Sequence, residues 1–191
     1  MSNIYSFSEA FKNGYSLILT KIFFRKARLI RRPVYIRGKK SLSGGERLTI
    51  GRFCRFDLEG SKKTLLIGKN CQFGDMTHIV AHEKVTIGDN VLIASKVFIS
   101  DTSHGSYKGS NQSDISIPPA DRELVTNPVS IGNNVWIGEN VVILGGANIG
   151  EGSIIGANAI ITKNIEAGSI VVGNNRVIKK YNNESHKWEA I

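Results

Sequence analysis

His104 occupies a position where an imidazole can perform acid–base chemistry. It lies in the run Asp101-Thr-Ser-His104-Gly105, where a regular stretch of the chain gives way to a long polar one. A histidine titrates near neutral pH and can take a proton from a hydroxyl group. A carboxylate such as that of Asp101 can orient the ring of such a base. From these residues alone, the alternative that His104 is an ordinary surface histidine stays open.

The other histidines and the two cysteines do not predict a metal site. His78 and His82 are four residues apart, and a zinc site would need their imidazoles to converge with that of distant His104. Cys54 and Cys71 each take the fifth place of a six-residue repeat. We interpret them as reduced, inward-facing side chains rather than a disulfide. Lone cysteines, the lack of a cleavable signal and the lack of a long apolar run predict a cytoplasmic protein.

A repeat of six residues must position these side chains. Between residues 131 and 166, an isoleucine opens each hexad and a small or β-branched residue follows four places later. The opening residues are Ile131, Ile137, Ile143, Ile149, Ile155 and Ile161, and the fifth residues are Val135, Val141, Ala147, Ser153, Ala159 and Ile165. A period of six fits neither an α-helix nor a plain strand. It predicts an all-β fold, a parallel β-helix with coils about 4.8 Å apart, and disfavours a β-sandwich.

The same repeat extends toward the N-terminus and is interrupted twice. Hexads open from residue 50, slip in phase between Ile79 and Ile87, and stop after the hexad of Ile99. The slip predicts a small bulge at residues 82–84. Residues 101–128 are polar and hold three of the four prolines. A long excursion from a regular scaffold usually carries function. Asparagines at 133, 134, 140, 148, 158 and 164 suit turns with left-handed backbone angles.

The excess positive charge lies in one segment. Residues 1–40 contain ten Lys or Arg and one acid, Glu9, whereas the rest of the chain is neutral overall. Apolar residues near helical spacing predict a helix there, ended at the latest by Pro33. Such a basic helix either lies on an anionic membrane surface or packs on the β-helix with its charges in water. Nucleic-acid binding is disfavoured because aromatic and basic residues are not interleaved. We expect three parts: 1–40, a β-helix at 41–175 and a charged C-terminal tail at 176–191.

Several motifs resemble the hexapeptide-repeat acyltransferases, such as the galactoside and maltose acetyltransferases. They are Val85–Ala94, His104-Gly105, Pro128–Gly138, Ile155–Ala157 and Thr162-Lys163. The stretch Ile93–Asp101, with Lys179–Asn182 and Trp188-Glu189, is most similar to O-acetyltransferases of bacterial O-antigen and capsule synthesis. The resemblance implies a left-handed β-helix and a homotrimer with active sites between subunits. It also implies an acetyl-CoA donor and a sugar acceptor, either lipid-linked or nucleotide-linked.

The resemblance assigns roles to individual residues. His104 would be the catalytic base, with Asp101 beside it, and Trp136 would pack near the thioester arm. The remaining donor-site residues are Gly138, Ala157, Thr162 and Lys163 along the CoA groove and Arg176 and Lys179 near the nucleotide phosphates, where cations suit an anion. His78 and His82 are candidates for the acceptor pocket.

Two departures from the family pattern concern the predicted site. The asparagine expected one coil before His104 is replaced by Gly74, so we assign an acceptor contact to the adjacent Asp75. The run Gly173-Asn-Asn-Arg176 lacks the family's proline. The resemblance is therefore a weaker guide to the CoA contacts of the C-terminal tail. Three readings remain: a sugar O-acetyltransferase at the inner face of the plasma membrane, an amino-sugar N-acetyltransferase, and a zinc lyase like the γ-class carbonic anhydrases. A β-helix without chemistry would not need the ordered set of His104, Trp136 and Thr162-Lys163.

Overall fold

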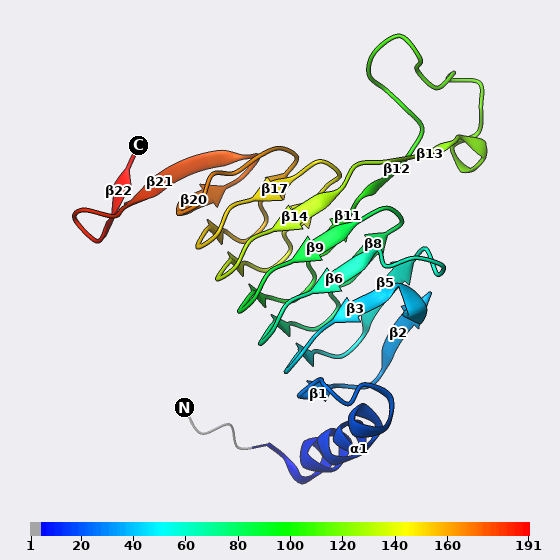
Figure 1. Ribbon diagram of the computed structural model, residues 1–191, viewed down its shortest axis with the longest axis vertical. Coiled ribbons are helices and arrows are strands. Elements are labelled where there is room, and N and C mark those ends of the chain that lie inside the picture. Colours follow the sequence, from blue (N-terminus) through cyan, green and yellow to red (C-terminus); the bar gives the residue numbers. More distant parts are fainter. Residues whose placement is uncertain (1–4) are drawn as a thin grey trace.

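The computed structural model describes residues 5–191 as a three-sided stack of coils, with helix α1 (Phe7–Phe23) across its N-terminal end (Figure 1). Each coil gives one short strand to each of three parallel sheets, which we call faces A, B and C. Neighbouring strands in a face come from successive coils, so β10 lies between β7 and β15. The chain is therefore a parallel β-helix, as the hexad repeat predicts.

The strands of the three faces are as follows. Face A contains β1 (Leu29–Ile30), β4 (Thr49–Ile50), β7 (Gln72–Phe73), β10 (Leu92–Ile93), β15 (Trp136–Ile137), β18 (Ile154–Ile155), β20 (Ser169–Val172), β21 (Arg176–Asn182) and β22 (Lys187–Ala190). Face B contains β2 (Val34–Arg37), β5 (Cys54–Leu58), β8 (His78–Ala81), β11 (Phe98–Ser100), β16 (Val142–Ile143) and β19 (Ile160–Ile161). Face C contains β3 (Leu42–Gly44), β6 (Leu65–Ile67), β9 (Val85–Ile87), β14 (Val129–Ile131) and β17 (Asn148–Ile149).

The repeat builds the core because equivalent residues stack from coil to coil. On face A, Ile137 pairs in register with Ile93 on one side and Ile155 on the other. All opening isoleucines between 131 and 166, and all fifth residues of those hexads, are buried. Truncating one such isoleucine to alanine leaves a cavity that costs about 2–5 kcal/mol in packed interiors.

Asparagines shape several corners of the coils. Asn134, Asn140 and Asn158 have φ angles of 57°, 58° and 60°, which confirms the left-handed turns predicted there. Asn133 has another role, because its Oδ1 accepts the backbone N–H of Asp89 from the preceding coil at 2.8 Å. Asn148 lies in strand β17 instead of a turn.

The cysteines are buried core residues, as predicted. Cys54 and Cys71 carry free thiols and have no exposed surface. Burial raises the pKa of Cys54 to about 11 and also raises the pKa of Cys71. Both thiols therefore stay protonated at neutral pH, which makes them poor nucleophiles.

The structure moves the N-terminal boundary of the β-helix and shows how the C-terminal segment folds. The β-helix begins at residue 29, not 41, because β1 pairs with β4 and β2 pairs with β5 in parallel. The expected C-terminal tail is a β-hairpin: β21 runs antiparallel to β20, and β22 returns against β21. The rings of Tyr181 and Trp188 pack edge to face across the hairpin, with centroids 5.3 Å apart.

Helix α1 confirms the predicted helix in the basic segment. Its first turn is closed by a capping box, in which the Ser6 hydroxyl accepts the Glu9 N–H and the Glu9 carboxylate accepts the Ser6 N–H. The helix ends at Phe23, before the densest run of arginines. Within residues 5–191, no helix combines the length and apolar character needed to cross a bilayer.

Candidate active site

His104 lies at the base of the excursion, which leaves the stack between β11 on face B and β14 on face C (Figure 1). It ends strand β12 (Thr102–His104), which pairs antiparallel with β13 (Leu124–Thr126). The excursion also holds a short 3-10 helix, η2 (Pro119–Asp121). The β12–β13 ladder fixes the backbone of His104 opposite Leu124, and its side chain is exposed.

A chain of side-chain contacts holds the His104 backbone from within the excursion. The Tyr107 hydroxyl donates a hydrogen bond to the carbonyl oxygen of His104 at 2.5 Å, and Arg122 Nη1 donates to that hydroxyl at 2.7 Å. Arg122 Nε also donates to the Ile117 carbonyl at 2.9 Å. Gly105 has a φ of 98°, and a Cβ there would lie 2.9 Å from the Tyr107 oxygen. Sequence reasoning missed Tyr107 and Arg122, because no local motif marks their pairing.

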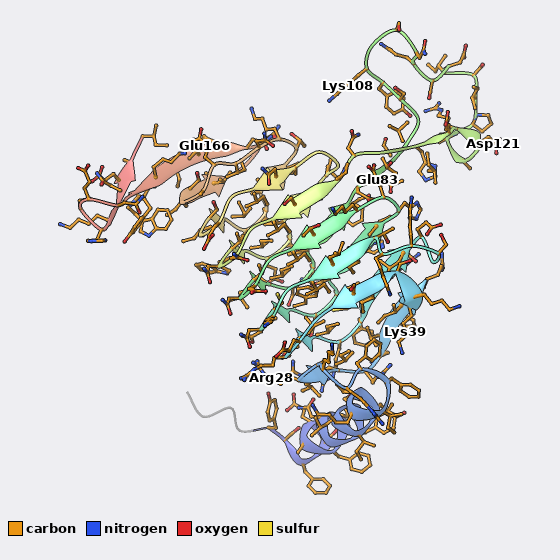
Figure 2. The ribbon with its side chains drawn as sticks, in the orientation of Figure 1. Arg28, Lys39, Glu83, Lys108, Asp121 and Glu166 are labelled. Carbon is orange, nitrogen blue, oxygen red and sulfur yellow. The ribbon has the colours of Figure 1, made fainter. Side chains whose placement is uncertain are left out.

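Asp101 has a different position from the one expected for an orienting carboxylate. Its side chain is buried and accepts the backbone N–H groups of His82, Glu83 and Lys84 at 2.8–3.0 Å. It also accepts the Thr102 hydroxyl at 2.7 Å. Within residues 5–191, no hydrogen bond joins this carboxylate to His104. Asp101 therefore fastens the predicted bulge at 82–84 to the base of the excursion, where Glu83 is labelled in Figure 2.

The candidate acceptor residues are spread over several surfaces. His78 lies half-buried on face B, with Nε2 3.1 Å from Asp57 Oδ2 and its ring 5.1 Å from that of Phe98. His82 lies at the corner fastened by Asp101. Asp75 is at the corner between faces A and B, where its Oδ1 accepts the backbone N–H of Arg52 from the preceding coil. Among residues 5–191, no group of three or more His, Cys, Asp and Glu side chains is placed to hold a metal ion.

Two predicted donor residues lie on the same edge of the stack as the excursion. Thr162 and Lys163 follow β19 and are exposed at the edge between faces B and C. The side chain of Asn175 clamps Thr162: Oδ1 accepts the Thr162 N–H and Nδ2 donates to Oγ1, both at 2.9 Å. Asn175 lies in the run that departs from the family pattern, so this departure supplies a contact of its own that the sequence did not reveal.

The other predicted donor residues lie elsewhere on the stack. Trp136 is 52% exposed on face A, in strand β15. Gly138 is buried at the corner between faces A and B, where a Cβ would lie 2.6 Å from the Ala157 backbone nitrogen. Arg176 and Lys179 are exposed on β21. Face A lies opposite the edge between faces B and C in a three-sided stack, so one chain does not bring Trp136 to His104.

The comparisons with known proteins agree with this architecture. A family model described as bacterial transferase hexapeptide (six repeats) matches residues 128–163. Over 175 residues, the chain is 43% identical to an Escherichia coli (strain K12) protein named lipopolysaccharide biosynthesis O-acetyl transferase WbbJ, covering 91% of this chain and 89% of that one. It is also 41% identical to the galactoside O-acetyltransferase of the same organism, over 64% of this chain and 57% of the relative.

Solved structures share the fold. The galactoside acetyltransferase in complex with coenzyme A is 33% identical, with a TM-score of 0.62, over 78% of this chain and 70% of that chain. The Bacillus cereus N-acyltransferase AntD is 24% identical, with a TM-score of 0.71, over 97% and 93% of the two chains. The hexad repeat, the coil architecture and the similarity to these relatives show that the chain belongs to the hexapeptide-repeat acyltransferase family.

Proposed function

We propose that the protein transfers the acetyl group of acetyl-CoA to a sugar hydroxyl during synthesis of a surface polysaccharide, an O-antigen or a capsule. The observation that carries the proposal is the exposed imidazole of His104 on a backbone fixed by the β12–β13 ladder and by Tyr107. Family membership and the coenzyme A complex of the galactoside acetyltransferase support the assignment of acetyl-CoA as the donor. The acceptor class is supported by the lipopolysaccharide relative.

The reaction needs a base because a sugar hydroxyl hardly ionises at neutral pH. In the proposed mechanism, His104 takes the hydroxyl proton as the oxygen attacks the thioester carbonyl. The new C–O ester bond forms, the C–S bond breaks, and the imidazolium returns the proton to the CoA sulfur. Such general-base assistance contributes roughly 10²–10⁴-fold to the rate. Cys54 and Cys71 are buried thiols, so the proposal includes no acyl-enzyme.

The proposed active enzyme is a homotrimer with shared sites. One chain has Trp136 and His104 on opposite sides of the stack. In the proposed shared site, one subunit therefore contributes His104 and its neighbour contributes Trp136. We expect His104→Asn and Trp136→Ala to be inactive alone. Refolding the two variants together should restore part of the activity, because some sites then combine two intact halves. No recovery from a confirmed mixed oligomer would contradict shared sites, as would light scattering that shows a fully active monomer.

The proposed location is the cytoplasm, at the inner face of the plasma membrane. The buried reduced cysteines and the acetyl-CoA donor support the compartment. The charge excess of residues 1–40 supports contact with an anionic membrane. Separation of cell lysates into soluble and membrane fractions at low and high salt would test this placement.

The proposal is tested by replacing the base. His104→Asn removes the imidazole, and we expect kcat to fall at least about a hundredfold with the CoA dissociation constant unchanged. His186→Asn is the matched control, because His186 is exposed on the C-terminal hairpin. Activity of His104→Asn within a few-fold of wild type would refute the role of His104. An amide instead of an ester in the mapped product would indicate N-acetyl transfer to an amino sugar.

A further inference from the structure

Helix α1 is held to the stack through polar side chains. Ser16 and Thr20 are buried against the first coil. The Thr20 hydroxyl accepts the Ile30 N–H at 2.9 Å, and the Ser16 hydroxyl accepts the Arg32 N–H at 3.1 Å. These two hydrogen bonds therefore help to fix the orientation of this helix on the β-helix.

The opposite side of α1 is an exposed apolar stripe. Residues spaced by three or four positions share one side of a helix. The stripe consists of Phe7, Phe11, Tyr15, Ile18 and Ile22, which are 90%, 73%, 55%, 63% and 59% exposed. A helix that only packs on its own protein turns such a stripe inward, and here it points outward.

Cations surround the stripe. Lys12 and Lys21 lie on either side of it by helical spacing, and both are exposed. Arg28 and Lys39 lie near α1 at the N-terminal end of the stack (Figure 2). The one acid of residues 1–40, Glu9, is engaged by its capping bonds to Ser6. The end of the stack that carries α1 is therefore apolar and cationic together.

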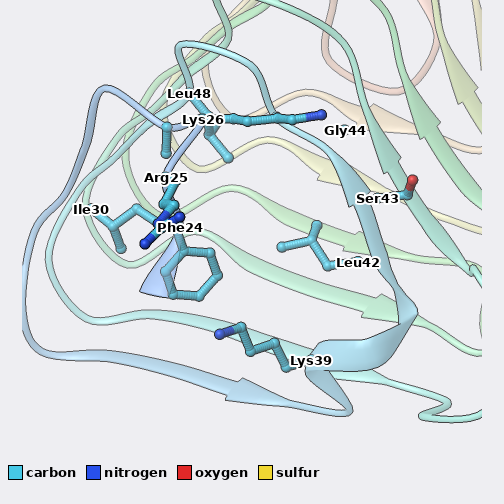
Figure 3. Close-up of a pocket in the computed structure, with 11 residues that line it drawn as sticks. Phe24, Arg25, Lys26, Ile30, Lys39, Leu42, Ser43, Gly44 and Leu48 are labelled. Carbon is cyan, nitrogen blue, oxygen red and sulfur yellow. The ribbon is translucent and has the colours of Figure 1, made fainter. Parts of the chain in front are cut away.

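A hollow beside the helix end has the same character. It has a volume of about 230 Å³, and Phe24 and Leu48 give it apolar walls. Arg25, Lys26 and Lys39 contribute to its lining, and no acidic residue does (Figure 3). The Lys39 ammonium lies 4.3 Å from the centre of the Phe24 ring. Apolar walls beside cations suit a phospholipid, whose phosphate is anionic and whose remaining surface is largely apolar.

We propose that this end of the molecule is a docking surface for an anionic lipid bilayer. The stripe enters the boundary between headgroups and acyl chains, and Arg25, Lys26 and Lys39 face lipid phosphates. In the proposed homotrimer the subunits would contact one another through the faces of the stack, whereas α1 lies across its end (Figure 1). The docking does not depend on the reaction. The further step, that docking brings the enzyme to an acceptor held on a membrane lipid, rests on the proposed function.

The test is sedimentation of the full-length protein with vesicles at low salt. Vesicles of phosphatidylcholine with phosphatidylglycerol should bind the protein, and vesicles of phosphatidylcholine alone should bind it at least about tenfold less. Phe11→Ser combined with Ile18→Ser should weaken binding at least about tenfold, because two apolar side chains no longer leave water. Arg25→Glu combined with Lys26→Glu should weaken it at least about fivefold, and added salt should shrink this difference.

Two controls separate docking from general effects. Ile191→Ser removes an exposed apolar side chain from the opposite end of the chain, and Lys187→Glu reverses an exposed charge there. Both should bind vesicles as wild type does. Failure of the wild-type protein to sediment with anionic vesicles would overturn the proposal. So would a stripe variant that changes the oligomeric mass and not vesicle binding, because a second copy would then cover the stripe. Turnover of a water-soluble acceptor, measured separately, tests the reaction without involving the membrane.

Discussion

The carboxylate of Asp101 accepts the backbone N–H of Lys84 at 2.8 Å, across 17 positions of the sequence. The same buried group accepts the N–H groups of His82 and Glu83 and the hydroxyl of Thr102. These bonds join the extra residues of one coil to the point where the next coil opens into the excursion. The base of the excursion is thus fixed from inside the stack, directly before strand β12, which ends at His104.

We predict that Asp101→Asn destabilises the fold more than it slows the reaction. Asparagine offers one acceptor oxygen, and its amide nitrogen would face the buried N–H donors of Glu83 and Lys84. Each buried donor left unpaired costs about 1–3 kcal/mol, so with two such donors the free energy of unfolding in urea should fall by about 2–6 kcal/mol. The kcat of the folded fraction should stay within a few-fold of wild type.

A second aspartate provides the control for this prediction. Asp89 accepts one backbone N–H, from Lys69 at 2.7 Å, at a partly exposed corner. Asp89→Asn should therefore cost less than about 1 kcal/mol. If Asp101→Asn kept full stability and lost turnover, the carboxylate would act on the His104 ring after all, as sequence reasoning suggested.

The Tyr107 hydroxyl is predicted to position the proposed base. Tyr107→Phe keeps the ring but removes the bonds to the His104 carbonyl and to Arg122. We expect kcat to fall about tenfold, below the hundredfold loss that a misplacement of about 1 Å can cause. The KM for acetyl-CoA and the shape of the pH–rate profile should not change, because the donor groove and the imidazole remain. Tyr35→Phe, an exposed tyrosine on β2, is the control, and an unchanged kcat in Tyr107→Phe would exclude the positioning role.

Much of the fold could be read from the sequence because one physical constraint repeats. Stacked coils about 4.8 Å apart require equivalent residues at equal intervals, so the isoleucine columns appear directly as a period of six. The interruption at residues 101–128 was visible for the same reason. The N-terminal boundary was placed too late because the arginines and Pro33 were assigned to the basic helical segment, although Ile30 and Ile36 are six residues apart and β1 and β2 pair with β4 and β5.

The contacts within the candidate site were less predictable. The bonds of Asp101 go to backbone N–H groups, which no residue type displays. Tyr107 and Arg122 are 15 residues apart and meet only because the excursion folds back on itself. Asn175 was visible as a departure from the family pattern, but its clamp on Thr162 needs the coil geometry. In the proposed trimer, Trp136 of one subunit would lie near His104 of another, and no single chain shows this arrangement.

The proposed donor groove gives a third prediction, at Lys163. Lys163→Glu should raise the apparent constant for acetyl-CoA about fivefold and leave the acceptor constant nearly unchanged, because a negative charge beside the groove repels anionic CoA. The neighbouring Thr162 is held by Asn175, so the backbone should keep its shape. Lys62→Glu reverses an exposed charge at a distant loop and should have no effect on either constant. An unchanged donor constant in Lys163→Glu would remove this lysine from the site.

The Asp57 carboxylate on face B gives a pH-dependent prediction. It lies 2.6 Å from Arg55 Nε, 3.1 Å from His78 Nε2 and 3.5 Å from Arg37 Nη1. Burial raises the pKa of Asp57, but hydrogen bonds from Arg55 and His78 and the charges of Arg55 and Arg37 outweigh it and hold the pKa below the ordinary 3.8. A carboxyl group with a lowered pKa contributes stability that is present above its unfolded pKa and is lost as pH falls through the folded one.

Asp57→Asn should therefore destabilise the protein at about pH 6 and less at about pH 3, which lies below the ordinary pKa of 3.8. At the higher pH we expect a loss of about 1 kcal/mol, since the cationic partners are largely exposed. Urea unfolding of both proteins at the two pH values measures the difference. Asp121→Asn, an exposed aspartate in the excursion, should show no pH-dependent difference from wild type. A destabilisation by Asp57→Asn that is equal at both pH values would mean that packing, and not the charge of this cluster, stabilises face B.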